Sequence, residues 1–168
     1  MSTLTLKRIA GAALIAAAAA LAPLAAASTT SHTVTISAKL KVTGGPPPTC
    51  SAGICTIKNH GTGTMTPYGK VTFTTVITAD GNQPPCGTRS QWVNRIVRKI
   101  HTNKGNLVLH EAGLQCPKRG VGPQVRAVWA VDGADSTGTF AGAYGQGHTI
   151  AYPAQDTAFD KGTITLAR

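Results

Sequence analysis

The sequence predicts an all-β domain, a small antiparallel barrel of roughly eight strands, and three observations support this fold class. Apolar and polar residues alternate with period two in several segments, most clearly at residues 32–42, as expected of strands with one buried face. Short turn sequences separate these segments. Glycines punctuate residues 135–152, DSTGTFAGAYGQGHTIAY, and glycine within a strand pattern marks the bends that a closed sheet needs.

The first half of the chain is expected to supply three strands. The first covers residues 32–42, HTVTISAKLKV, and a glycine-proline run at 44–48 ends it, since proline donates no ladder hydrogen bond. Residues 56–66 and 70–79 are predicted to form a β-hairpin around the turn sequence at 67–69, Pro-Tyr-Gly. The residues that share one face of its second strand are Val71, Phe73, Thr75 and Ile77.

Residues 89–102 are ambiguous between a helix and a strand. Apolar residues recur there at helical spacing with cations between them, and Ser90 and Gly105 would suit the two ends of a helix. The same residues are largely β-branched, which favours a strand. A turn sequence at 103–106 then leads into the apolar residues 107–109. We therefore expect a strand, a turn and a second strand.

The last third of the chain is expected to complete the barrel. Residues 113–122 contain Cys116-Pro117 and several glycines and are predicted to form a loop. The glycine-marked stretch 135–152 is predicted to be the corner of the barrel, and residues 162–166 form a closing strand that pairs with the first, so that no edge stays open. Another strand is expected at 124–131, with one face formed by Val125, Ala127, Trp129 and Val131.

The first 27 residues have the features of an export signal. Lys7 and Arg8 precede an apolar, alanine-rich core, and the alanines at 25–27 provide the small residues that signal peptidases require. The apolar run is short for a membrane span, which needs about 20 residues, so cleavage is favoured over a membrane anchor. The remaining residues 28–168 fit one domain, which we expect to be secreted or periplasmic.

The chain is basic and contains four cysteines. Its 16 Lys and Arg residues outnumber 6 acidic residues, for a net charge of +10 at pH 7. This charge favours an anionic envelope surface, with mere solubility as the alternative. An even number of cysteines in an exported domain predicts two disulfides, and of the three possible pairings we favour Cys50–Cys55 and Cys86–Cys116. Zinc is the less favoured alternative, because the spacings are not those of zinc modules.

No catalytic constellation emerges from the sequence. His110 and Glu111 are an adjacent acid–base pair, but neighbouring strand residues point to opposite faces, so a surface or rim role is favoured. Asp132 and Asp135 could hold a cation, although Asp-Gly is first a turn sequence. The other histidines lack metal-ligand spacing, and neither a nucleophile motif nor a dinucleotide motif is present. We predict no cofactor and no metal.

Two sets of residues are candidates for binding. Aromatic side chains could contact an apolar ligand in the barrel or could simply fill its core. These aromatic candidates are Phe73, Trp92, Trp129, Phe140 and Tyr144. Four cations could contact an anionic partner or could form a freely solvated face. These cationic candidates are Arg95, Arg98, Lys99 and Lys104.

Two segments resemble a known family. DSTGTFAGAYGQGHTI resembles the glycine signature of bacterial secreted proteins with an allene oxide cyclase-like barrel, which plant dirigent proteins also use, and GTGTMTPYGKVTFTT resembles an earlier strand pair of those proteins. The resemblance implies an eight-stranded barrel in which an apolar interior is possible. It carries over no catalytic residues. Residues 84–122, with two cysteines and a basic segment, depart from the family's pattern.

The expected function is non-enzymatic: a secreted barrel that binds a small apolar ligand or contacts an anionic partner at the cell envelope. One alternative is a dirigent- or cyclase-like enzyme that acts on an apolar intermediate inside the barrel. Another is a secreted inhibitor or toxin that acts through the basic segment. We expect no specific nucleic-acid partner and no membrane-spanning segment after cleavage of the signal. An interior pocket with an ionisable side chain and a bound water would favour the enzyme, whereas a solid barrel would favour contact through the surface.

Overall fold

The computed structural model of the chain describes residues 31–81 and 91–167, with only the backbone described for 91–94. The predicted export segment 1–27 lies outside the described residues. Within them the structure is all-β, as predicted, and no helix is long and apolar enough to cross a membrane. The elements are β1 (His32–Gly44), β2 (Thr49–Ser51), β3 (Ile54–Thr66), β4 (Gly69–Asp80), β5 (Gln91–Thr102), β6 (Gly105–Lys118), β7 (Gly122–Val131), the 3₁₀ helix η1 (Gly138–Phe140), β8 (Tyr144–Tyr152), the 3₁₀ helix η2 (Pro153–Gln155) and β9 (Thr157–Leu166).

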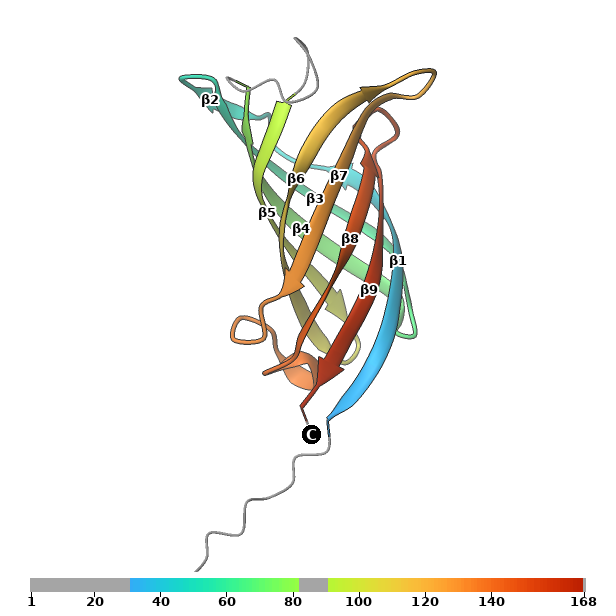
Figure 1. Cartoon of the computed structure of the whole chain (residues 1–168). Helices are drawn as coiled ribbons and strands as arrows, with labels where there is room; N and C mark the ends of the chain where they lie inside the picture. The colour runs from blue at the N-terminus through green and yellow to red at the C-terminus, as the bar shows by residue number, and fades with distance from the viewer. Residues whose placement is uncertain (1–30, 82–90, 168) are drawn as a thin grey trace, which may run out of the picture.

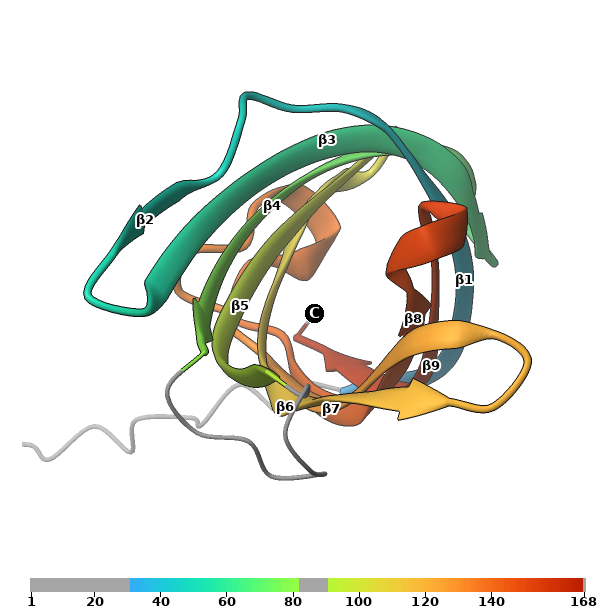
Figure 2. The same ribbon diagram turned by 90° about the horizontal axis from the view of Figure 1, so that it is seen from above.

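The strands form a closed antiparallel barrel (Figure 1, Figure 2). They pair in the order β1-β9-β8-β7-β6-β5-β4-β3, and β1 also pairs with β3, which closes the ring of eight strands. The predicted contact between the first and last strands is confirmed, since β1 and β9 pair from His32↔Leu166 to Lys41↔Thr157. The short β2 pairs only with the start of β3 and lies outside the ring. Closure leaves the long strands without an open edge.

The period-two pattern of the sequence becomes the inside and the outside of this barrel. In β1, Ile36, Ala38 and Leu40 are buried, whereas the Ser and Lys residues between them are exposed. In β7 the alternate residues Val125, Ala127 and Trp129 are likewise buried, as predicted. Each strand therefore contributes one row of side chains to the interior and one to solvent.

The ambiguous segment 89–102 is a strand wherever the structure describes it. β5 pairs with β4 on one side and with β6 on the other. Ile96, Arg98 and Ile100 are buried and Arg95 is exposed, which is the alternation of a strand rather than of a helix. Apolar β-branched residues on both faces of the strand had imitated helical spacing. Pairing with two neighbouring strands overrides that local pattern.

The predicted loop at residues 113–122 is wrong over its first part. Residues 113–118 continue β6 and pair with β7 as far as Lys118↔Gly122. Pro117 lies opposite Pro123 near the end of this hairpin, where the loss of a ladder donor interrupts little of the sheet. Glycine and proline in this segment predicted a loop. The segment is a strand because residues 122–127 of β7 pair with it along its whole length.

Only the second half of the glycine-marked stretch is a strand. Residues 135–143 form a turn and η1, which fold across one end of the barrel (Figure 1). The backbone N–H groups of Thr137 and Thr139 donate to the carbonyls of Asn106 (2.9 Å) and Lys104 (2.8 Å). Gly138 adopts φ +64°, a left-handed conformation that strands do not contain. Glycine serves a bent strand and a tight turn equally well, so the sequence did not separate them.

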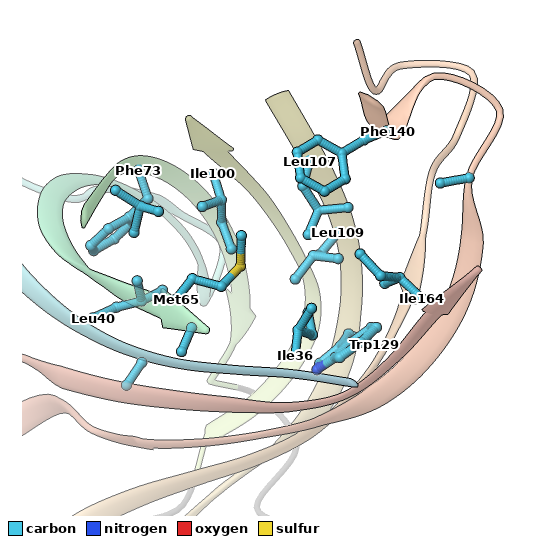
Figure 3. Packing of buried hydrophobic residues seen from close by; sticks show 14 of the residues in the cluster. Ile36, Leu40, Met65, Phe73, Ile100, Leu107, Leu109, Trp129, Phe140 and Ile164 are labelled. Carbon is cyan, nitrogen blue, oxygen red and sulfur yellow. The ribbon is translucent and has the colours of Figure 1, made fainter. Parts of the chain in front are cut away.

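An apolar core fills the barrel next to this plug (Figure 3). Phe140, from η1, is fully buried, and its ring meets that of Tyr68 edge to face at 5.0 Å between centroids. The other fully buried apolar side chains come from five strands of the ring. They are Ile36, Leu40, Met65, Ile100, Leu107, Leu109 and Ile164.

Two glycines make room for Trp129, the bulkiest side chain of this core. Trp129 on β7 lies opposite Gly147 on β8, and Gly147 lies opposite Gly162 on β9. A Cβ atom at Gly147 would overlap Cζ2 of the indole, and one at Gly162 would lie 2.5 Å from the same atom. The Trp129 ring therefore lies across both glycines. The sheet bends sharply here, since both Cβ atoms would also meet backbone carbonyls of neighbouring strands.

The first predicted disulfide is confirmed. Cys50 and Cys55 are cross-strand partners on β2 and β3 and are joined by a disulfide. Cys116 is also disulfide-bonded, whereas Cys86 lies outside the described residues, so its pairing stays a prediction. No cysteine in the described part of the chain is free to bind zinc.

We expect Gly147→Ala to lower the free energy of unfolding by about 1–3 kcal/mol, because the added methyl group overpacks the site of the Trp129 indole. Urea unfolding followed by fluorescence measures the change. Thr163→Ala, on the exposed face of β9, is the control and should change stability by about 0.5 kcal/mol or less. Equal stability of Gly147→Ala and the wild type would show that the glycine is not required.

Candidate functional site in the barrel interior

A cluster of charged side chains lies inside the barrel. Arg98 from β5, Glu111 from β6 and Asp160 from β9 are each at most 4% exposed. They occupy inward positions, in phase with the apolar residues of their strands. Burying three charges is costly unless they are paired, so their contacts decide whether the barrel tolerates them.

Arg98 holds both acids. Its Nη1 donates to Oδ2 of Asp160 at 3.2 Å, and its Nη2 donates to Oε2 of Glu111 at 3.3 Å. Its Nε lies 2.7 Å from Oε1 of Glu111, a close ionic contact without the alignment of a hydrogen bond. Thr149 on β8 donates its hydroxyl to Oδ1 of Asp160 at 2.7 Å. Four strands are thereby cross-linked through the middle of the barrel.

The cluster contains more acid than base, and its titration reflects this. Burial raises the pKa of Glu111 from 4.5 to about 7; Arg98 opposes the shift and the charge of Asp160 adds to it. Burial lowers the pKa of Arg98, but the attraction of Asp160 and Glu111 outweighs that effect and raises it overall. The guanidinium therefore stays charged, and the Glu111 carboxyl changes its charge near neutral pH.

A cavity of about 230 Å³ lies next to this cluster inside the barrel, and Pro153 of η2 is among the residues that line it. Figure 2 looks down the barrel and shows the strands that surround this interior. Arg98 and Thr149 line it, whereas Glu111 and Asp160 do not. The charged cluster is thus the floor of the cavity. The apolar residues of the walls are Val42, Ile57, Phe73, Ile77, Ala79, Ile96, Val125, Ala151 and Ala158.

The size and walls of the cavity suit a small organic molecule. An apolar protein cavity of about 150 Å³ holds benzene, so 230 Å³ accommodates a substituted benzene or a molecule of similar bulk. Mostly apolar walls with a few convergent polar groups are typical of ligand sites. The barrel is therefore neither solid throughout nor open from end to end, because the core fills the plugged half.

The predicted aromatic residues are spread over three environments. Phe73 lines the cavity. Trp129 and Phe140 fill the packed core, the alternative that the sequence left open. Tyr144 is a correction, since its side chain is 63% exposed and cannot contact a ligand in the interior. The side chain of Trp92 lies outside the described residues.

The predicted cationic patch is not one surface. Arg98 is a correction, because it is 4% exposed and bound to two acids inside the barrel. Arg95 and Lys104 are exposed, and Lys99 is partly exposed. Strand residues rise about 3.3 Å each, so Lys104, beyond the far end of β5, lies more than about 20 Å from Arg95. Strand alternation places Arg95 on the outer face of β5 and Arg98 on the inner face, so the two could not belong to one surface.

Sequence reasoning missed Thr149 and Asp160, and the surface or rim role that it favoured for Glu111 is wrong, because Glu111 is buried inside the barrel. A signal was present, since Glu111 is in phase with Leu107 and Leu109 on the inner face of β6. The predicted separation of the adjacent pair is confirmed: Glu111 faces inward, whereas the ring of the partly exposed His110 lies 3.2 Å from Oδ2 of Asp132.

The residues Asp132 and Asp135 lie in a turn on the outside of the barrel. Ligand atoms of His110, Asp132 and Asp135 lie within 4.8 Å of one another. Oδ1 of Asp132 accepts hydrogen bonds from the backbone N–H groups of Ala134 and Asp135, both at 3.1 Å. These bonds fix the turn after β7, which is the role that the sequence favoured.

A second hollow, of about 790 Å³, lies on the outer surface over β1, β3 and β4. Its rim carries the cations Lys39, Lys41 and Lys70, and threonines fill the spaces between them. No acidic residue is found among the described residues that line it. The outward rows of these strands thus form a positive groove that the predicted patch did not include.

Comparison of the chain with protein-family models, with curated proteins and with solved structures found no match. The fold and the interior site therefore rest on the geometry described above.

We expect the stability of the protein to fall as the pH rises from about 4.5 to about 7. In this window the Glu111 carboxyl keeps its proton in the folded protein but has already lost it in the unfolded chain. The folded protein therefore binds more protons than the unfolded chain, and its free energy of unfolding decreases as the pH rises. Glu111→Gln has no such proton. The melting temperature of the wild type should therefore drop by several degrees relative to that of the variant.

Thermal unfolding followed by circular dichroism across the window measures this difference. Parallel curves for the two proteins would contradict a raised pKa at Glu111. The difference in melting temperature between the wild type and Glu111→Gln removes the contribution of every group that titrates alike in the two proteins.

Proposed function

We propose that the protein binds a small, largely apolar ligand in the mouth of the barrel. The observation that carries the proposal is the 230 Å³ cavity, with apolar walls on several strands and a polar floor. The resemblance to secreted allene oxide cyclase-like barrels agrees with this site, since it implies a barrel in which an apolar interior is possible. An exported binding protein is consistent with the predicted signal sequence and disulfides.

Binding is favoured over catalysis by the nature of the cavity floor. Arg98 is the charged side chain there that contacts the cavity, and its raised pKa keeps it from exchanging protons near neutral pH. Glu111, whose pKa lies near 7, does not line the cavity. A cyclase- or dirigent-like reaction would therefore find no proton donor or acceptor at the floor among the described residues, and the acid that lines the cavity is Asp156, next to η2 at the mouth.

We expect Ile77→Trp to abolish binding of isopropylbenzene, a probe of suitable size, because Ile77 lines the cavity and the indole would fill it. Val76→Trp is the matched control, since Val76 is the adjacent residue and is 41% exposed on the outer face. Titration calorimetry measures both variants and the wild type. Loss of binding in both variants, or in neither, or no binding to the wild type, would refute the proposal.

A second candidate function is contact with an anionic polymer through the outer groove. The specific observation is the cluster of Lys39, Lys41 and Lys70 without an acidic neighbour in the lining, on a chain of net charge +10. Exposed charges attract anionic partners and are screened by salt. This surface replaces the predicted patch as the site for an envelope partner.

We expect the double variant Lys39→Gln, Lys70→Gln to weaken binding of inorganic polyphosphate by about tenfold or more at low salt, and raised salt to weaken binding to the wild type. Arg95→Gln with Lys104→Gln removes the same charge from outside the groove and is the control. Fluorescence anisotropy of labelled polyphosphate measures each. Equal losses in the two double variants would show that net charge alone, and not the groove, binds the polymer.

A further inference from the structure

We infer that the ligand of the barrel mouth carries a neutral hydrogen-bond acceptor, such as a carbonyl or ether oxygen, that binds the Arg98 guanidinium at the cavity floor. This inference rests on the proposed function and specifies its ligand. It depends on the donors that Arg98 has left, on the position of the acids and on the balance of charge.

Arg98 has more donors than its partners use. A guanidinium carries five N–H groups. Nε faces Glu111, one hydrogen of Nη2 is donated to Glu111, and one hydrogen of Nη1 is donated to Asp160. One N–H on Nη1 and one on Nη2 remain without a hydrogen-bond partner among the described residues. Buried donors are nearly always satisfied in native proteins, by protein groups, water or a ligand, so these two N–H groups can serve an acceptor that enters the cavity.

The cavity is the place from which that acceptor would come. Arg98 lines the cavity and its two acidic partners do not, so an acceptor that enters the mouth meets the arginine rather than the carboxylates. Cross-strand register places Asn59, Thr75 and Arg98 side by side on β3, β4 and β5, and all three line the cavity. A polar row thus interrupts the apolar wall beside the guanidinium, where the polar end of a ligand would lie.

The surrounding charges favour a neutral acceptor over an anion. Glu111 and Asp160 both contact the guanidinium, and Asp156 lines the cavity as well. At pH 8, where Glu111 is mostly ionised, a carboxylate in the cavity would face a site that is already net negative. A carbonyl or ether oxygen accepts the same N–H groups without that repulsion.

Three probes with equal numbers of non-hydrogen atoms test the inference: isopropylbenzene, acetophenone and benzoate. In the wild type at pH 8, acetophenone should bind more tightly than benzoate. The carbonyl stretch of bound acetophenone should lie at a lower frequency than that of acetophenone in an alkane solvent, because the oxygen accepts a hydrogen bond. Calorimetry and infrared difference spectroscopy measure the two quantities on the unmodified protein.

A variant then assigns the hydrogen bond to Arg98. Arg98→Met alone would leave two buried acids unpaired, so it is combined with Glu111→Gln and Asp160→Asn. In this triple variant, confirmed as folded by circular dichroism, the affinity of acetophenone relative to isopropylbenzene should fall about tenfold or more, the effect of one hydrogen bond to a charged donor. Arg98→Lys, which keeps a cation but loses the planar fork, serves if the triple variant does not fold and should also lower the ratio.

The outcomes separate the inference from the proposed function. An alkane-like carbonyl frequency, tighter binding of benzoate than of acetophenone, or an unchanged affinity ratio in the variants overturns the inference while isopropylbenzene still binds in the mouth. Failure of every probe to bind the wild type, or binding that survives Ile77→Trp, overturns the proposed function itself.

Discussion

Closure of the sheet, through pairing of β1 with both β9 and β3, is the constraint on which the rest of this structure depends. A closed ring has one interior, so every inward side chain competes for the same limited space. Glycines at 147 and 162 let the ring bend beneath Trp129, and the η1 segment plugs one end with Phe140. Packing is thereby concentrated in one half of the barrel, and the other half retains a cavity.

The charged cluster marks the boundary between these halves. Arg98, Glu111 and Asp160 lie between the apolar core and the cavity, and only the arginine of the three contacts the cavity. An unpaired charge would be destabilised in this interior, and the contacts of Arg98 with Glu111 and Asp160 pair all three charges.

Alternation also gives the same strands a second surface. β1 and β4 present Leu40 and Phe73 to the interior, while Lys39 and Lys70 point outward and contribute to the positive groove. The mouth and the groove differ in chemistry: most residues that line the mouth are apolar, whereas lysines and threonines predominate along the groove. Thr157 lines both, so the two hollows meet at the start of β9.

The sequence by itself determined the all-β class, the inner and outer faces of the regular strands and the favoured Cys50–Cys55 disulfide, because each follows from local alternation or short spacing. The opposite orientations of His110 and Glu111 followed for the same reason. The pairing of the first strand with the last was expected on a different ground, the need of a closed sheet to leave no open edge. Only the tertiary structure decided that residues 135–143 plug the barrel, that β6 continues to Lys118 and that Arg98 meets Glu111 and Asp160. These features depend on which strands close around a side chain, and a local pattern contains no information on partners that lie 13 or 62 residues away.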